Sequence, residues 1–202
     1  STDNERPFAS INFTDNKIII ITGLGKILIS EQLSENNLEN NIKNIKFRKI
    51  NNNLSNFKIE SKWNYERNFV KDSLIDGNDL YLFITYKKIK NDGDYFTYKI
   101  LKADLSKKNL IFKEFFFAKK DLRPEKDLLH SGGRIISFDK KNLLITSPDF
   151  GYPNLAQDKK SLFGKILKIN KINGNYQIFS SGHRNPQGLF YDKDNDLILS
   201  TE

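Results

Sequence analysis

The sequence of 202 residues has no cysteine, no methionine and only two histidines. The absence of cysteine excludes a disulfide framework, a thiolate metal site and a cysteine nucleophile. Chemistry that needs an imidazole must therefore use His130 or His183. Apolar runs such as residues 18–21 are far shorter than the roughly 20 residues of a membrane-spanning helix. We therefore expect no transmembrane segment in this stretch of chain.

Acidic residues are outnumbered, 25 against 33 lysines and arginines, which leaves a net charge of +8. A basic chain invites a nucleic-acid interpretation, but only six of the basic residues are arginine, the side chain that reads base edges best. The lysines are spread among asparagine and aspartate in turn-like segments. This pattern favours solvated lysines on loops and no nucleic-acid partner. A nucleic-acid surface is the weaker alternative.

The chain lacks an initial methionine and stops within or just after what reads as a strand. We therefore expect a piece of a longer chain, truncated at both ends, whose missing signal peptide carries no information on compartment. Hydrophobic residues make up 38% and aromatic residues 12% of the chain, which disfavours disorder. We find no linker, so we expect residues 1–202 to form one partial domain, with no second domain.

One pattern recurs four times: an apolar strand, a tight turn rich in Asp, Asn, Lys or Gly, and a second strand rich in β-branched residues or leucine. The turns are residues 14–17, 76–79, 139–142 and 192–196. Asn, Asp and Gly supply the backbone conformations of such turns, so each copy predicts a β-hairpin. The anchors Phe13, Ile75, Phe138 and Tyr191 are 62, 63 and 53 residues apart.

Further strands follow the hairpins. The tetrapeptide Gly-Lys-Ile-Leu occurs after the first hairpin, at residues 25–28, and after the third, at residues 164–167. Residues 95–103 and 110–117 are expected to be outer strands after the second hairpin. Four-stranded units at this long period are the signature of a β-propeller. We therefore predict an all-β fold that comprises about three to four blades of a β-propeller, the parent having about six.

Two segments do not fit the repeat. Residues 30–41 are the single helix candidate, and their asparagine content makes it a weak one. The asparagine-rich stretch 36–56 has low complexity. We interpret it as a long, mobile excursion between outer strands and not as a domain boundary.

The first candidate for chemistry is a histidine followed by small residues, in the run 130–134 at the entry to the third repeat. In a propeller, the loop that enters an innermost strand lies at the mouth of the central channel, where ligands bind. Asp149 follows the next strand and could reach back to orient the imidazole of His130, as general bases commonly require. The alternatives are that His130 caps a turn through a backbone hydrogen bond and that Asp149 belongs to an ordinary aspartate turn.

The second candidate is the loop before the fourth repeat, in which His183, Arg184, Asn185 and Gln187 crowd into five positions. The loop occupies the same place in its repeat as His130 does in the third, so both are expected at one end of the channel. A planar guanidinium with amide side chains suits a planar, oxygen-rich, anionic ligand. An Asn-Pro turn with an exposed arginine is the alternative.

The acidic run 192–196 resembles the start of a calcium loop. It lacks the glycine at position six and the glutamate at position twelve of such loops. It also falls on the turn that every repeat has, so we assign it to a hairpin. We assign no metal ligand within the 202 residues.

From His130 to Glu202 the sequence resembles the soluble quinoprotein glucose dehydrogenases and the related glucose/sorbosone (aldose sugar) dehydrogenases. The matching segments are 130–134, 149–151, 156–158, 163–170, 182–189 and 200–202. The run Gly-His-Arg-Asn-Pro-Gln-Gly among them is highly specific. The resemblance implies a six-bladed propeller that binds pyrroloquinoline quinone and calcium and oxidises aldose sugars in the periplasm or outside the cell. The calcium ligands are expected beyond Glu202.

Carried over by position, the resemblance makes His130 the general base that takes the proton from the anomeric hydroxyl of the sugar, and makes Asp149 the residue that holds its imidazole. Arg184 would stabilise negative charge on the quinone oxygen. Asn185 would hydrogen-bond the quinone, with Gln187 nearby. The electron acceptor stays unassigned, and the isolated 202-residue piece is expected to be inactive. A non-catalytic propeller that binds a glycan or a protein partner is the alternative function.

Overall fold

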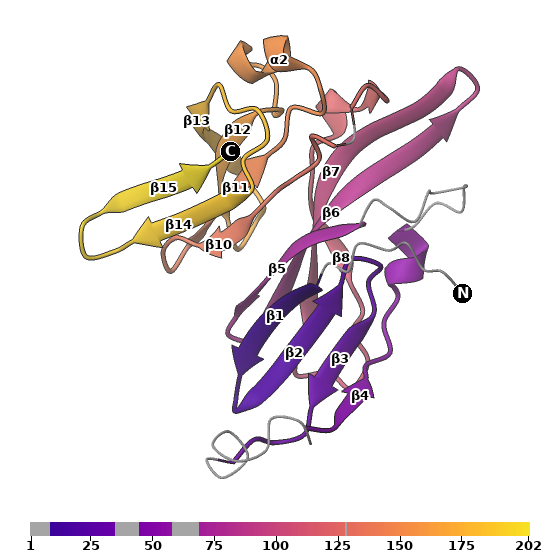
Figure 1. Ribbon diagram of the computed structural model, residues 1–202, viewed down its shortest axis with the longest axis vertical. Helices are drawn as coiled ribbons and strands as arrows, with labels where there is room; N and C mark the ends of the chain where they lie inside the picture. The colour runs from indigo at the N-terminus through magenta and orange to yellow at the C-terminus, as the bar shows by residue number, and fades with distance from the viewer. Residues whose placement is uncertain (1–8, 35–44, 58–68, 128) are drawn as a thin grey trace.

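The computed structural model describes residues 9–34, 45–57, 69–127 and 129–202, and it is built mainly of antiparallel β-sheets (Figure 1). The first sheet contains β1 (Ala9–Thr14), β2 (Lys17–Thr22), β3 (Ile27–Ser30) and β4 (Phe47–Lys49), in that order. The second contains β5 (Val70–Asp76), β6 (Asp79–Lys90), β7 (Gly93–Asp104) and β8 (Lys113–Phe117), with β9 (Arg123–Pro124) paired to β7. The third contains β10 (Ile135–Ser137), β11 (Asn142–Ser147), β12 (Lys165–Asn170) and β13 (Tyr176–Ser181). The strands β14 (Gly188–Asp192) and β15 (Leu197–Thr201) form the last hairpin.

The sheets are arranged around an axis. The strand β5 contacts both β1 and β10, and β10 contacts β14. The first strand of each sheet therefore lies beside the first strand of the next. These four are the innermost strands, and the other strands of each sheet follow in chain order away from them. This arrangement confirms the predicted all-β fold of consecutive propeller blades.

The predicted turns close the innermost strand of each sheet onto its neighbour. In the first hairpin, Asp15 and Asn16 have φ angles of 48° and 54°, and this left-handed conformation gives a two-residue turn the twist that a hairpin needs. In the last hairpin, the Asp192 carboxylate accepts hydrogen bonds from the N–H groups of Asp194 (3.1 Å) and Asn195 (3.3 Å). The acidic run is thus a hairpin turn that the aspartate stabilises.

The second sheet is buried on both faces because it lies between two others. Alternate residues of β6 point to opposite sides. Leu80, Leu82 and Ile84 belong to the core shared with the first sheet, and Tyr81 and Phe83 to the core shared with the third. All five are fully buried. The continuous apolar run of β6 is therefore the pattern of a strand that is covered on both faces.

The helix predicted for residues 30–41 is wrong in the part that the structure describes. Ser30 ends β3 and residues 31–34 are not helical, while residues 35–41 lie outside the described residues. The N–H of Glu31 donates to the carbonyl of Lys46 (3.0 Å), and the N–H of Leu33 donates to that of Asn16 (2.8 Å). Pairing with neighbouring segments thus replaces the hydrogen bonds of a helical turn.

The outer parts of the blades also depart from the sequence prediction. Of the stretch 36–56, residues 36–44 lie outside the described residues, and the rest contains β4, the outermost strand of the first sheet, and runs into the 3₁₀ turn η2 (Leu54–Phe57). The strand predicted for 110–117 begins only at Lys113. A short helix, α2 (Pro153–Gln157), was not predicted, although Pro153 in its first turn is a typical start signal. Among the described residues, no helix is long and apolar enough to cross a membrane.

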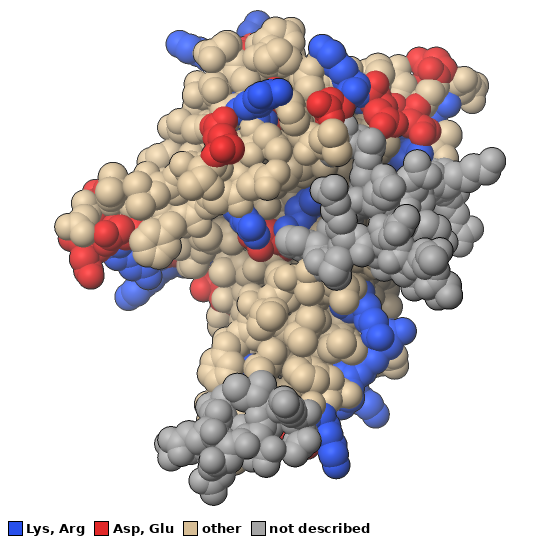
Figure 2. Space-filling view, in the orientation of Figure 1, with Lys and Arg blue, Asp and Glu red and all other residues tan. Residues whose placement is uncertain are grey.

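Charged side chains are dispersed over the surface. On the face shown in Figure 2, lysine and arginine form several small groups, some of them next to acidic side chains. Lysines also pair with carboxylates of the hairpin turns, as in Lys102 with Asp79 (2.8 Å) and Lys171 with Asp76 (2.7 Å). On this face, the net positive charge is therefore not gathered into one patch.

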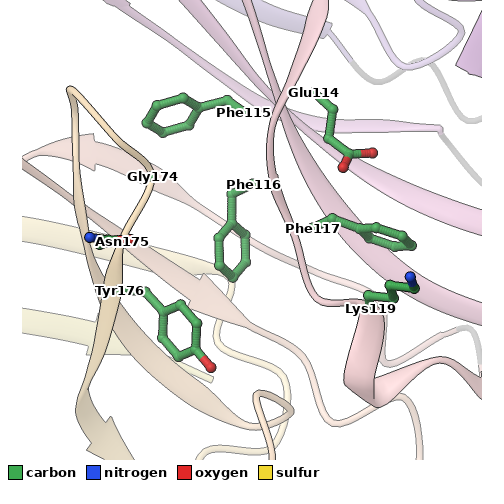
Figure 3. Close-up of a pocket in the computed structure, with 8 residues that line it drawn as sticks. All are labelled: Glu114, Phe115, Phe116, Phe117, Lys119, Gly174, Asn175 and Tyr176. Carbon is green, nitrogen blue, oxygen red and sulfur yellow. The ribbon is translucent and has the colours of Figure 1, made fainter.

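An open groove of about 700 Å³ lies between β8, the outer strand of the second sheet, and the start of β13, the outer strand of the third (Figure 3). It is lined by Glu114, Phe115, Phe116, Phe117, Lys119, Gly174, Asn175 and Tyr176. The rings of Phe116 and Tyr176 meet edge to face with centroids 5.5 Å apart, so aromatic packing joins the two blades here. None of the lining residues belongs to the predicted site.

The α2 loop is tied to the third sheet by Lys165, a lysine with 0% exposure. Its ammonium donates to three carbonyl oxygens, those of Leu155 (2.8 Å), Ala156 (2.6 Å) and Phe163 (2.8 Å). These bonds use all three donors of the ammonium. Burial lowers the pKa of Lys165, against the smaller raising effect of the nearby Asp121.

We expect Lys165→Met in the full-length protein to lower the free energy of unfolding by about 3 kcal/mol, because methionine fills the space but leaves three carbonyls without their charged donor. Urea unfolding measures the change. The matched control is Lys159→Met, at an exposed position in the same segment, which should alter stability by less than about 0.5 kcal/mol. Equal stability of the two variants would show that the buried ammonium is dispensable.

Candidate active site

The candidate site begins at the loop between β9 and β10, where the imidazole of His130 meets the carboxylate of Asp149. The Nδ1 atom of His130 is 3.2 Å from Oδ1 of Asp149. The Asp149 side chain is 1% exposed and that of His130 is 19% exposed, so the carboxylate is buried and the imidazole keeps some exposure to solvent. The Nε2 atom lies 3.7 Å from Oδ2 of Asp127, which is too far for a hydrogen bond.

A tight turn after β11 holds Asp149 in place. Phe150 and Gly151 have φ angles of 51° and 79°, so the chain reverses directly after the aspartate. Oδ1 of Asp149 also accepts the N–H of Gly151 (2.8 Å), and the N–H of Phe150 donates to the carbonyl of His130 (3.1 Å). Both the side chains and the backbones of the two segments are therefore joined.

The Arg184 loop, between β13 and β14, is attached to this pair through its backbone. The carbonyl of Arg184 accepts the N–H of Asp149 (2.8 Å), and the N–H of His183 donates to the carbonyl of Gly164 (3.1 Å). The side chain of Arg184 is exposed. The guanidinium thus projects from a loop whose backbone is bonded to the residue that contacts His130.

Asn185 joins the same two loops with its side chain. Its Oδ1 accepts the N–H of Gly132 (3.0 Å), and its Nδ2 makes a long contact with the carbonyl of Leu129 (3.5 Å). A Cβ atom at Gly132 would lie 2.8 Å from Cγ of Gln187 and 2.9 Å from Oδ1 of Asn185. The approach of the two loops therefore requires glycine at position 132.

The structure thus brings all the predicted site residues to adjoining loops of two neighbouring blades. His130 and Asp149 are in direct contact, Arg184 is reached through its backbone, and Asn185 bridges the loops. Gln187 is exposed and packs close to Gly132. The catalytic and cofactor-binding roles of these residues remain predictions.

The structure also shows two charged residues in this region for which the sequence analysis proposed no role. Asp72, on β5, accepts hydrogen bonds from the N–H of Ile135 (2.9 Å) and from Arg134 (3.4 Å), and Nε of Arg134 donates to the carbonyl of Gln187. Burial raises the pKa of Asp72, and the bonds from Ile135 and Arg134 oppose that rise. The pair connects the second, third and fourth blades beside the site. Its partners are 62 residues apart, so no local pattern could have revealed it.

In the described part of the chain, no group of three or more histidine or carboxylate side chains is placed to hold a metal ion. A calcium site formed by ligands beyond Glu202 remains an expectation from the resemblance.

Sheets arranged around an axis, with polar loops gathered at the entry to innermost strands, define the chain as part of a β-propeller. A comparison with protein families gives the particular family. The profile of the glucose/sorbosone dehydrogenases matches residues 5–202, so the chain belongs to this family. No curated protein sequence matches the chain significantly.

Solved structures with the same fold include a pyrroloquinoline-quinone-bound aldose sugar dehydrogenase from Streptomyces coelicolor. It is 19% identical, with a TM-score of 0.64, and the match covers 100% of this chain and 57% of that one. The apo form of a soluble aldose sugar dehydrogenase from Escherichia coli is 16% identical, with a TM-score of 0.60, and the match covers 97% of this chain and 56% of that one. At these identities the matches establish the fold, and the chain spans little more than half the length of either protein.

Proposed function

We propose that the protein to which this chain belongs is an aldose dehydrogenase that depends on pyrroloquinoline quinone. The observation that carries the proposal is the His130–Asp149 pair, joined through a backbone hydrogen bond to the loop that presents Arg184. A hydroxyl that loses hydride needs a base for its proton, and the group that receives the hydride needs positive charge nearby. The two loops supply both functions from neighbouring blades.

His130 is the proposed base. The Asp149 carboxylate is an acceptor, so Nδ1 of the neutral imidazole carries its proton toward Asp149 and Nε2 keeps the lone pair. Nε2 would then take the proton of the sugar hydroxyl, and the cofactor, when bound, would supply the acceptor for the hydride. Asp149 fixes the tautomer and stabilises the imidazolium that forms.

The exposed polar side chains of the Arg184 loop fit the quinone cofactor. Pyrroloquinoline quinone, when bound, supplies the two-electron acceptor for the hydride. It is a planar anion, and the exposed Arg184 fork with the exposed amide of Gln187 provides donors for such a ligand. Oδ1 of Asn185 is occupied by the N–H of Gly132, so the contribution of Asn185 to the cofactor is through its Nδ2 group.

Three further elements of the proposal come from the family resemblance. Calcium would act as a Lewis acid at the quinone, held by ligands beyond Glu202. The substrate is an aldose, and the compartment is the periplasm or the outside of the cell. The electron acceptor of the reduced cofactor is left unassigned.

The experiment that tests the proposal uses the full-length protein with calcium. Pyrroloquinoline quinone is titrated into the protein, and dye reduction is followed with a panel of aldoses. Saturable quinone binding and aldose-dependent dye reduction are expected. A protein that binds no quinone would overturn the enzyme proposal and leave the non-catalytic propeller that binds a glycan or protein in its place.

A further inference from the structure

The carboxylate of Glu202 contacts two consecutive residues of the Arg184 loop. Its Oε1 is 2.7 Å from Nδ1 of His183, and its Oε2 accepts the backbone N–H of Arg184 at 2.8 Å. The second ring nitrogen of His183 is 2.9 Å from Oγ of Ser180. The carboxylate and the imidazole therefore form one bonded unit between β13, the Arg184 loop and the end of β15.

This unit is suited to hold a backbone in place. The His183 side chain is 18% exposed and that of Glu202 is 38% exposed, so the hydrogen bonds are partly shielded from water. Burial raises the pKa of Glu202, but the hydrogen bonds from Arg184 and His183 outweigh it and leave that pKa below its usual value. Hydrogen bonds from backbone N–H groups to an ionised carboxylate are among the stronger ones in proteins.

A continuous series of hydrogen bonds runs from Glu202 to the proposed base. Glu202 accepts the N–H of Arg184, and the carbonyl of Arg184 accepts the N–H of Asp149 (2.8 Å). Oδ1 of Asp149 then contacts Nδ1 of His130 (3.2 Å). The backbone of Arg184 is thus bonded to a carboxylate on one side and to the residue that contacts His130 on the other.

We infer that Glu202 and His183 are positioning residues that set the place of Arg184 relative to His130. The inference rests on the proposed function for the roles of Arg184 and His130. Neither residue needs to touch the substrate or the cofactor. Without the Glu202 carboxylate, the N–H of Arg184 loses its acceptor, and the loop that starts after Gly182, whose φ is 92°, is less constrained.

The test compares Glu202→Ala and Glu202→Gln in the full-length protein. Glutamine keeps an oxygen for the N–H of Arg184, and its amide nitrogen donates to Nδ1 of His183 once that ring adopts the other tautomer. We expect Glu202→Ala to raise the dissociation constant for pyrroloquinoline quinone at least about tenfold and to lower turnover, since small displacements of positioned groups are costly. Glu202→Gln is expected to restore most of both.

A double-mutant cycle separates positioning from general stabilisation. In the Arg184→Ala background, Glu202→Ala is expected to cause no further loss of quinone affinity, because the group that it positions is gone. The control is Glu114→Ala. Glu114 lies on β8 and is also ion-paired, with its carboxylate 2.7 Å from the ammonium of Lys99. The substitution should leave quinone affinity unchanged. Losses that add in the double variant would overturn the inference.

Amide hydrogen exchange tests the positioning without the cofactor. Exchange in the segments 183–187 and 147–151 is expected to be faster in Glu202→Ala and to return to the wild-type rate in Glu202→Gln. Unchanged exchange in both segments would overturn the inference. A wild-type protein that binds no quinone, yet shows this exchange pattern, would contradict the proposed function and not the positioning of the loop.

Discussion

Replacing His130 by alanine in the full-length protein is expected to lower the turnover of an aldose by about 10² to 10⁴-fold, the usual contribution of a positioned general base. The geometry gives the reason. The imidazole is held at Nδ1 by Asp149, which is almost completely buried, while its side chain keeps some exposure to solvent. Alanine removes the lone pair that we propose takes the hydroxyl proton, and no other histidine lies in that loop. Single-turnover reduction of the bound quinone by the sugar measures the effect.

The affinity for pyrroloquinoline quinone is the control for His130→Ala, because His130 is assigned to the proton of the sugar and not to the cofactor. Titration of the variant should give a dissociation constant close to that of the wild type. Turnover at the wild-type level would exclude His130 as the base. Loss of quinone binding together with turnover would assign the residue to the cofactor.

Replacing Arg184 by alanine is expected to lower turnover by about 10² to 10³-fold, the size of effect seen when one stabilising donor is removed from a site of developing charge. The exposed guanidinium is presented by a loop that is bonded to Asp149. In the proposed function it meets the negative charge that grows during hydride transfer. Arg184→Lys should recover only part of the activity, because a point charge cannot reproduce the planar fork. Steady-state dye reduction and quinone titration measure both variants.

The matched control for this series is Arg48→Ala. Arg48 lies on β4 with an exposed side chain, in a different blade from the site. Its loss should leave turnover and quinone affinity unchanged. If Arg48→Ala and Arg184→Ala lower turnover equally, the effect belongs to net charge and the assignment of Arg184 fails. Full activity in Arg184→Lys would show that only the charge matters.

The hairpins illustrate what can be read from the sequence. Asp15 and Asn16 adopt left-handed conformations that few other residues accept, and the flanking strands pair residue by residue across them. Such contacts are local, so the residues of the turn decide them. The recurrence of these turns then predicted the blades, because each hairpin begins a new sheet.

Segments without such a local signal were interpreted less well. Within the described residues 31–34, Glu31 bonds to Lys46, which lies just before β4, and Leu33 bonds to Asn16 in the turn between β1 and β2. The sequence does not indicate that Lys165 is fully buried. The carbonyls that surround its ammonium come from α2 and from Phe163, just before β12, and only the folded loop brings them together. In both cases the tertiary packing of the segments decided the outcome, and the pattern of neighbouring residues did not.

The sequence by itself determined the hairpins, their turns and the residue types of the candidate site, since these depend on neighbours along the chain. Only the tertiary structure decided how the site is held together. Asn185 is joined to Gly132, Arg134 to Asp72, and Arg184 to Glu202. These contacts cross 53, 62 and 18 residues respectively. The first two form because blades that are distant in sequence place their loops side by side around one axis. The third joins the two open ends of the β14–β15 hairpin. Local sequence patterns carry no record of such packing.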